Sequence, residues 1–132
     1  MILLLRLLFM TVIASMLGVT SWASLHQSLG AFVHGATLRD PWVIATLFDA
    51  YWAFIAVYVW VAWKEQSLAA RVLWFVAFIA LGNMAIAAYF LRELFSIPDT
   101  GPLADVFARR NPGRVVLAGI LTAASVVIYL LA

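Results

Sequence analysis

Four stretches of almost unbroken apolar sequence constrain this chain more than any other feature. They cover about residues 2–23, 41–63, 68–95 and 114–132. A helix needs about 20 apolar residues to cross a hydrocarbon core about 30 Å thick, and each stretch is close to that length. The strict alternation of a barrel strand is absent, so helices must satisfy the backbone in lipid. The sequence therefore predicts an all-α fold, an integral membrane bundle of four transmembrane helices.

The composition favours the same class. Hydrophobic residues make up 67% of the 132 residues and charged residues only 11%. This leaves too little polar material to cover a soluble domain of this size. The chain has no cysteine, so disulfides and thiolate metal sites are excluded. The net charge of +2 comes from single, dispersed charges, which favours contact with lipid headgroups over binding to nucleic acid.

Capping residues predict where two of the helices begin. Asp40 followed by Pro41 has the pattern of an N-cap before a first-turn proline. Asn111 followed by Pro112 repeats that pattern before the last apolar stretch. Residues 64–67, Lys-Glu-Gln-Ser, are a short polar turn between the second and third stretches. We therefore expect those two helices to form an antiparallel hairpin.

The last connection is longer and more polar. Residues 97–102 contain two prolines and should end the third helix. Residues 103–110, LADVFARR, have an amphipathic pattern and predict a short interfacial helix before the last transmembrane helix. No linker separates a second domain, so we expect a single membrane domain over residues 1–132 with an uncleaved first helix.

The expected four-helix path divides the cations between the two membrane faces. Five would lie on the face of the first and third connections: Arg39, Arg92, Arg109, Arg110 and Arg114. Three would lie on the opposite face: Arg6, Lys64 and Arg71. The positive-inside rule then leans towards a cytoplasmic location for the first and third connections. Arg6 near the N-terminus and the compact loop from Lys64 to Arg71 favour the reverse orientation, so both orientations stay open.

One carboxylate lies inside the second apolar stretch. Asp49 stands 17 residues before Gln66 in the hairpin turn, and Asn83 stands 17 residues after it. Two antiparallel helices would place these side chains at the same depth. We expect a contact between them inside the bundle, where Asp49 either holds the helices together or belongs to a ligand or proton site. The small residues expected to share the inward face of Asp49 are Thr46, Ala53 and Ala56. The candidate intramembrane polar site is Asp49, Asn83, Thr46, Tyr51 and Trp52.

The other charged residues favour simpler interpretations. Lys64, Glu65 and Arg71 are expected to form a solvated turn, with at most an exposed ion pair of little energetic weight. The three arginines near the last stretch are expected to contact lipid headgroups or a partner protein. They are Arg109, Arg110 and Arg114.

The sequence contains no pattern typical of a catalytic or metal centre. His26 and His34 lie between the first two stretches and, with Asp40, form only a weak metal-ligand pattern. Ser/His/Asp sets, paired carboxylates and glycine-rich phosphate loops are absent. We therefore expect no catalytic residue, no metal site and no intrinsic cofactor.

Five motifs follow one another over about residues 39–95: DPW, TLFDAY, WVAWKE, ARVLWF and LGNMA. This stretch resembles an uncharacterised family of short multi-pass membrane proteins found in bacteria and plants. The resemblance implies a membrane location and supports the second and third spans, but it implies no activity. The segment from about residue 97 onward is not part of the resemblance, and neither are the two histidines.

Two functions are compatible with these features. The favoured one is a non-enzymatic accessory subunit that docks on a larger respiratory or photosynthetic membrane complex and contacts lipid, quinone or pigment. The 19 aromatic residues suit contact with flat apolar partners. The alternative is a free-standing binder, carrier or isomerase-like enzyme for a lipophilic molecule, acting in a core around Asp49 and Asn83. The expected location is the bacterial inner membrane. The expected partners are the lipids of the bilayer and other membrane subunits.

Overall fold

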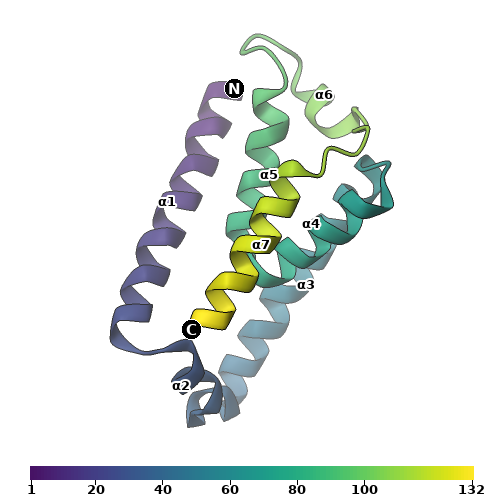
Figure 1. Cartoon of the computed structure of the whole chain (residues 1–132). Helices are drawn as coiled ribbons and strands as arrows, with labels where there is room; N and C mark the ends of the chain where they lie inside the picture. Colours follow the sequence, from purple (N-terminus) through teal and green to yellow (C-terminus); the bar gives the residue numbers. More distant parts are fainter.

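The computed structural model describes residues 1–132 and contains helices and connecting segments but no strands (Figure 1). Two helices are long: α1 (Ile2–His26) and α3 (Pro41–Lys64). They are the two helices whose length and composition would allow them to cross a membrane. A short connection, α2 (Leu29–His34) and the 3-10 turn η1 (Ala36–Arg39), joins them at one end of the molecule. The all-α prediction is confirmed.

The other helices are shorter. They are α4 (Leu68–Leu81), α5 (Asn83–Phe95), α6 (Leu103–Ala108) and α7 (Val116–Leu131). The short amphipathic stretch predicted before the last helix is helical, as α6, and its Val106 is buried. The predicted first, second and last helices all form, with ends that differ from the expected ones by no more than three residues.

The prediction of one continuous helix over residues 68–95 is corrected, because the chain reverses at Gly82. The rings of Trp74 on α4 and Tyr89 on α5 lie 4.8 Å apart between centroids. In a single helix, 15 residues would separate them by about 22 Å. α4 and α5 are therefore two arms of a hairpin, and α5 returns beside α1 towards the N-terminus (Figure 1).

Gly82 is the residue that allows this reversal. Its φ of 53° and ψ of −126° belong to a region that side chains with a Cβ rarely adopt. A Cβ at this position would also stand 2.8 Å from Cζ of Phe54 on α3. Glycine is thus required both by the backbone conformation and by the close approach of α3.

Capping explains two helix starts, and one expected cap is wrong. Asp40 Oδ1 accepts hydrogen bonds from the backbone N–H of Trp42 at 2.8 Å and of Val43 at 3.4 Å, which confirms the predicted N-cap of α3. Ser67 accepts from the N–H of Ala70 at the start of α4. The last helix begins at Val116 rather than directly after Asn111, because the Asn111 side chain bonds to other parts of the molecule.

The helices pack around two apolar clusters. The larger includes Val61, Trp74, Tyr89 and Ala118, so it joins α3, α4, α5 and α7. α7 runs parallel to α4, since Thr122 Oγ1 donates to the carbonyl of Leu73 and the Tyr129 hydroxyl donates to that of Ala80. The smaller cluster lies where α1, α5 and α6 meet, and is formed by Ile2, Leu94, Ile97 and Val106.

Candidate functional site

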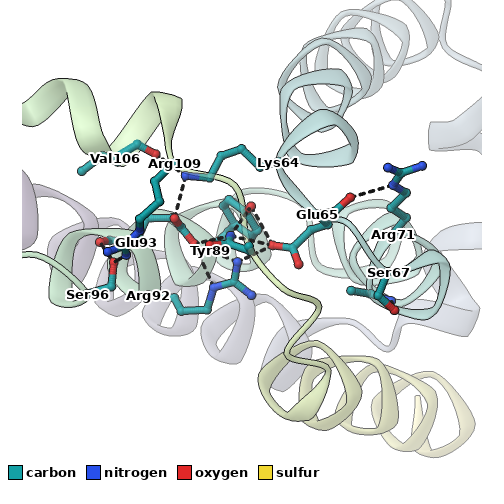
Figure 2. Close-up of polar contacts among 12 residues, drawn as sticks. Lys64, Glu65, Ser67, Arg71, Tyr89, Arg92, Glu93, Ser96, Val106 and Arg109 are labelled. Atoms are coloured by element: carbon teal, nitrogen blue, oxygen red, sulfur yellow. Dashed lines mark hydrogen bonds and ion pairs between the residues drawn. The ribbon is translucent and has the colours of Figure 1, made fainter.

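The end of α3 carries two charged residues that are fully buried. Lys64 and Glu65 are both 0% exposed, so the prediction of a solvated turn is wrong. Lys64 Nζ lies 2.7 Å from Glu93 Oε2 on α5 and also donates to the carbonyl oxygen of Val106 on α6 (Figure 2). A single lysine thus ties α3 to both α5 and α6.

Glu65 is held by α5. Its Oε1 accepts hydrogen bonds from Arg92 Nη2 and, at 2.9 Å, from the Tyr89 hydroxyl. Arg92 also donates to Glu93 Oε1, from Nη2 at 2.7 Å and from Nε at 3.0 Å. Two cations and two carboxylates therefore meet in one buried place with no net charge.

Asn111 brings the connection between α6 and α7 into the same contacts. Its Nδ2 donates to Glu65 Oε1 and to Glu93 Oε1, both at 2.9 Å. Its backbone also pairs with the turn after α3, because the N–H of Asn111 donates to the Lys64 carbonyl at 2.8 Å and its carbonyl accepts from the N–H of Gln66 at 3.1 Å. We call the six residues Lys64, Glu65, Tyr89, Arg92, Glu93 and Asn111 the buried polar cluster.

Aromatic rings enclose the buried polar cluster. The guanidinium carbon of Arg92 lies 4.5 Å from the ring centroid of Tyr89 and 5.2 Å from that of Trp74, which is fully buried. Such stacking suits arginine, whose planar cation is weakly hydrated. Among the atoms of the cluster and of Trp74, three buried polar atoms have neither a hydrogen bond nor an ion pair: Glu65 Oε2, Trp74 Nε1 and Arg92 Nη1.

The buried polar cluster can fix the relative positions of helices. Desolvating two ion pairs offsets much of their mutual attraction, so such a cluster adds little net stability, and we infer that it specifies one arrangement of the helices. Its contacts link the end of α3, the second half of α5, α6 and the start of the segment leading to α7. Two surface grooves, of about 330 and 240 Å³, have only hydrophobic lining residues, so neither brings the charged groups to a ligand. The geometry therefore supports a positioning role.

The expected contact between Asp49 and Asn83 is corrected. Both side chains are exposed, and no hydrogen bond joins them. Thr46 is exposed too and donates to the carbonyl of Trp42 in its own helix. Tyr51 bonds weakly to the Ile79 carbonyl, at 3.4 Å. The structure therefore does not gather the predicted polar site into an enclosed core.

The physical reason is the choice of helix face. α3 packs on α4 through bulky side chains: Phe54 lies against Gly82, and the Tyr58 ring lies 5.1 Å from that of Phe75. At 3.6 residues per turn, Asp49 lies on the opposite side of α3 from this aromatic face. Ala53 and Ala56, expected to face inwards, are exposed beside it. The interface between α3 and α4 is therefore formed by aromatic side chains, not by the small residues that the sequence predicts there.

The three arginines near the last helix are all exposed. Arg109 donates to the hydroxyl of Ser96, and the guanidinium carbon of Arg110 lies 5.3 Å from the ring centroid of Trp63. Both histidines bond through Nδ1 to carbonyls of their own helices, His26 to Trp22 and His34 to Gly30. No group of three or more His, Cys, Asp and Glu side chains lies close enough to hold a metal ion.

The sequence carries one signal for the buried polar cluster. Two adjacent pairs of opposite charge, Lys64-Glu65 and Arg92-Glu93, each end an apolar stretch of a chain with few charges. Such pairs could satisfy one another only if the chain reversed between them. The reversal at Gly82 is what brings the two charge pairs together, and hydropathy did not predict it.

Replacing Asn111 with alanine tests the link to the segment before α7. The change removes two hydrogen bonds to carboxylates, and we expect the free energy of unfolding to fall by about 2–3 kcal/mol. Denaturant unfolding in detergent, followed by tryptophan fluorescence, measures it. Asn83→Ala is the matched control, because that side chain is exposed and makes no hydrogen bond; a change of about 0.5 kcal/mol or less is expected there. Equal effects of the two substitutions would contradict the role of Asn111.

The fold and the buried polar cluster define an all-helical protein in which complementary charges join the ends of several helices, and in which two helices are long and apolar enough to cross a membrane. The chain belongs to a family described as proteins of unknown function (DUF1475), whose model matches residues 1–111. The match is wider than the resemblance over residues 39–95, since it includes α1, α6 and every member of the buried polar cluster. No curated protein and no solved structure matches the chain.

Proposed function

We propose that the protein is a small multi-pass integral membrane protein of the bacterial inner membrane. The length and composition of α1 and α3 support this. So does the amount of apolar surface that the chain leaves uncovered, since large side chains such as Leu4, Phe48 and Trp52 are more than half exposed. An apolar surface of this kind needs lipid or a protein partner to cover it.

We further propose that it serves as a non-enzymatic accessory subunit that docks on a larger membrane complex through α3. The observation that carries this proposal is the exposed carboxylate of Asp49, near the middle of a helix suited to cross a membrane. A carboxylate facing hydrocarbon is costly without a partner, and none of the four ion pairs of the chain includes Asp49. The chemistry that would satisfy it is a basic side chain on a helix of the partner.

The surroundings of Asp49 suit a second helix. Ala45, Ala53 and Ala56 are exposed on the same side of α3, and small residues let two helices approach closely. Next to them lies the groove of about 330 Å³ lined by Leu47, Phe48, Tyr51, Trp52 and Ile55. It could receive an apolar side chain of the partner helix.

The same groove supports the second candidate function, a binder or carrier for a lipophilic molecule such as a lipid, quinone or pigment. All five lining residues are apolar or aromatic, and Tyr51 and Trp52 belong to the polar site expected from the sequence. The groove is built from one helix alone and is open, so a partner helix would complete it better than a small ligand would. This is why the docking function is preferred.

Substitutions on α3 test the docking function. Asp49→Asn keeps the shape of the side chain but removes its charge, and we expect the association with the partner complex to weaken about 3- to 30-fold. Ala53→Leu should weaken it as well, because it separates the helices. The measurement is the fraction of protein that migrates with a large complex on native gels after mild detergent extraction.

Ala69→Leu on α4 is the matched control, because it places the same bulk at an exposed position of another helix. Its migration should equal that of the unchanged protein. Migration as a small species that carries an extracted lipid or pigment, unaffected by Asp49→Asn, would favour the lipophile binder instead. Unchanged co-migration of both α3 variants would refute docking through this face.

A further inference from the structure

The cations of this protein collect at one end of the molecule. Seven of the eight Lys and Arg residues lie there: Arg6, Lys64, Arg71, Arg92, Arg109, Arg110 and Arg114. Contacts between distant parts of the chain fix this grouping. Arg6 of α1 donates to carbonyls at the end of α5, Arg109 bonds to Ser96, and Arg71 donates to the Glu65 carbonyl. Four of the six carboxylates lie there too, Glu65, Glu93, Asp99 and Asp105, and three of them pair with Arg92, Lys64 and Arg6. The side chains at this end therefore keep a net charge of +3 (seven cations less four carboxylates), and we call it the cationic end.

The opposite end has few charged residues. It contains α2, η1 and the start of α3, where Arg39 is followed directly by Asp40. The far end of α7 also reaches it, because the carbonyl oxygen of Ala132 lies 3.7 Å from the position that a Cβ on Gly30 would occupy. α1, α3 and α7 therefore each run from one end to the other (Figure 1).

α4 and α5 do not run from end to end. They contain 14 and 13 residues, or about 20 Å each, which is short of a hydrocarbon core about 30 Å thick. α7, with 16 residues or about 24 Å, is also shorter than this, but its last residue reaches the opposite end beside α2. α4 starts at the cationic end, the chain turns at Gly82, and α5 returns to the cationic end, where Arg92 meets Glu65. The residues before α4 and after α5 thus lie together.

From these placements we propose that the chain crosses the membrane three times, with α4 and α5 as a re-entrant hairpin, and that the cationic end binds phosphate headgroups of the cytoplasmic leaflet. This inference rests on the proposed membrane location. The cytoplasmic leaflet carries anionic lipids, and cytoplasmic segments are enriched in Lys and Arg. Arg109, Arg110 and Arg114 are exposed and available to phosphates, and Trp63 beside Arg110 suits headgroup depth.

The absence of cysteine makes the path directly testable. Single cysteines are placed at three exposed positions, Gln27, Gln66 and Thr100. Labelling with a membrane-impermeant maleimide is compared in intact and permeabilised spheroplasts. We expect the Gln27→Cys variant to be labelled in intact spheroplasts, and the Gln66→Cys and Thr100→Cys variants only after permeabilisation.

Other results would overturn the inference in distinguishable ways. Four spans would place Gln27 and Thr100 on one side and Gln66 on the other. Labelling of Gln66→Cys and Thr100→Cys in intact spheroplasts, with Gln27→Cys protected, would reverse the orientation and remove the cytoplasmic leaflet as the partner. Release of the protein by alkaline carbonate would refute the membrane location itself, which is a failure of the proposed function.

A charge variant tests the role of the free arginines separately. Replacing Arg109, Arg110 and Arg114 together by glutamine should give a mixed labelling pattern at Gln66→Cys, because the orientation is no longer determined. Arg39→Gln, at the opposite end, is the matched control and should leave the pattern unchanged. An unchanged pattern in the triple variant would show that these arginines do not bind the cytoplasmic leaflet.

Discussion

Lys64→Met is expected to lower the free energy of unfolding by about 3–5 kcal/mol, because it leaves two buried carboxylates, Glu65 and Glu93, to share the single cation Arg92. The Lys64 side chain is 0% exposed and that of Glu93 is 2% exposed, so water cannot replace the lost partner. The substitution also removes the donor to the Val106 carbonyl. Denaturant unfolding in detergent measures the change through the tryptophan fluorescence.

The double variant Lys64→Met/Glu93→Met separates the effect of an unpaired buried charge from the effect of a changed side-chain shape. It removes one cation and one carboxylate together and leaves Arg92 paired with Glu65, so most of the lost stability should return. Arg110→Met is the control for a cation at the surface and should cost about 1 kcal/mol or less. Glu93→Met is measured alone as well; if the loss of stability in the double variant equalled the sum of the losses in Lys64→Met and Glu93→Met, the two residues would not be coupled.

Gly82→Ala is expected to destabilise the protein by about 2–5 kcal/mol. Part of the cost is the backbone conformation, since a residue with a Cβ is strained at the φ of 53° and ψ of −126° found there. The rest is the close contact with the Phe54 ring, which must move to make room. Thermal or denaturant unfolding in detergent measures the sum of both effects.

Two companion variants identify the causes. Adding Phe54→Leu to Gly82→Ala should restore only the part of the lost free energy of unfolding that arises from the close contact with the Phe54 ring. Gly119→Ala on α7, where nothing lies within 4 Å of the added Cβ, should be neutral or stabilising by about 0.5–1 kcal/mol. A chain in which Gly82→Ala is as harmless as Gly119→Ala would not have the reversal between α4 and α5.

Local features of this sequence are sufficient to predict the two long helices, α1 and α3. The apolar length of α1 and α3 and the Asp40-Pro41 cap depend only on neighbouring residues, and each is present in the structure. The reversal at Gly82 was not predicted, because hydropathy averages over the glycine and the apolar stretch continues on both sides. A Leu-Gly-Asn sequence within a stretch longer than one span was the available signal.

Because the reversal at Gly82 was not predicted, the buried polar cluster was not predicted either. A straight helix over residues 68–95 would place Lys64 and Glu93 at opposite ends of a span, so their pairing could not be foreseen. The same assumption divided the cations between two faces, whereas the structure groups seven of them. The inward face of α3 was also wrong, since Tyr58 and Phe54 rather than the small residues near Asp49 contact α4.

The contacts of Asn111 have a consequence for biogenesis. Lys64 and Glu65 are translated before either of their charged partners, and 27 residues separate Glu65 from Arg92. In the proposed membrane path, α4 and α5 would therefore enter the bilayer together, after both pairs of charges have emerged from the ribosome. Asn111 follows both pairs in the chain and precedes α7, so its hydrogen bonds can form before α7 enters the bilayer. The order of synthesis thus matches the order in which the charges can be neutralised.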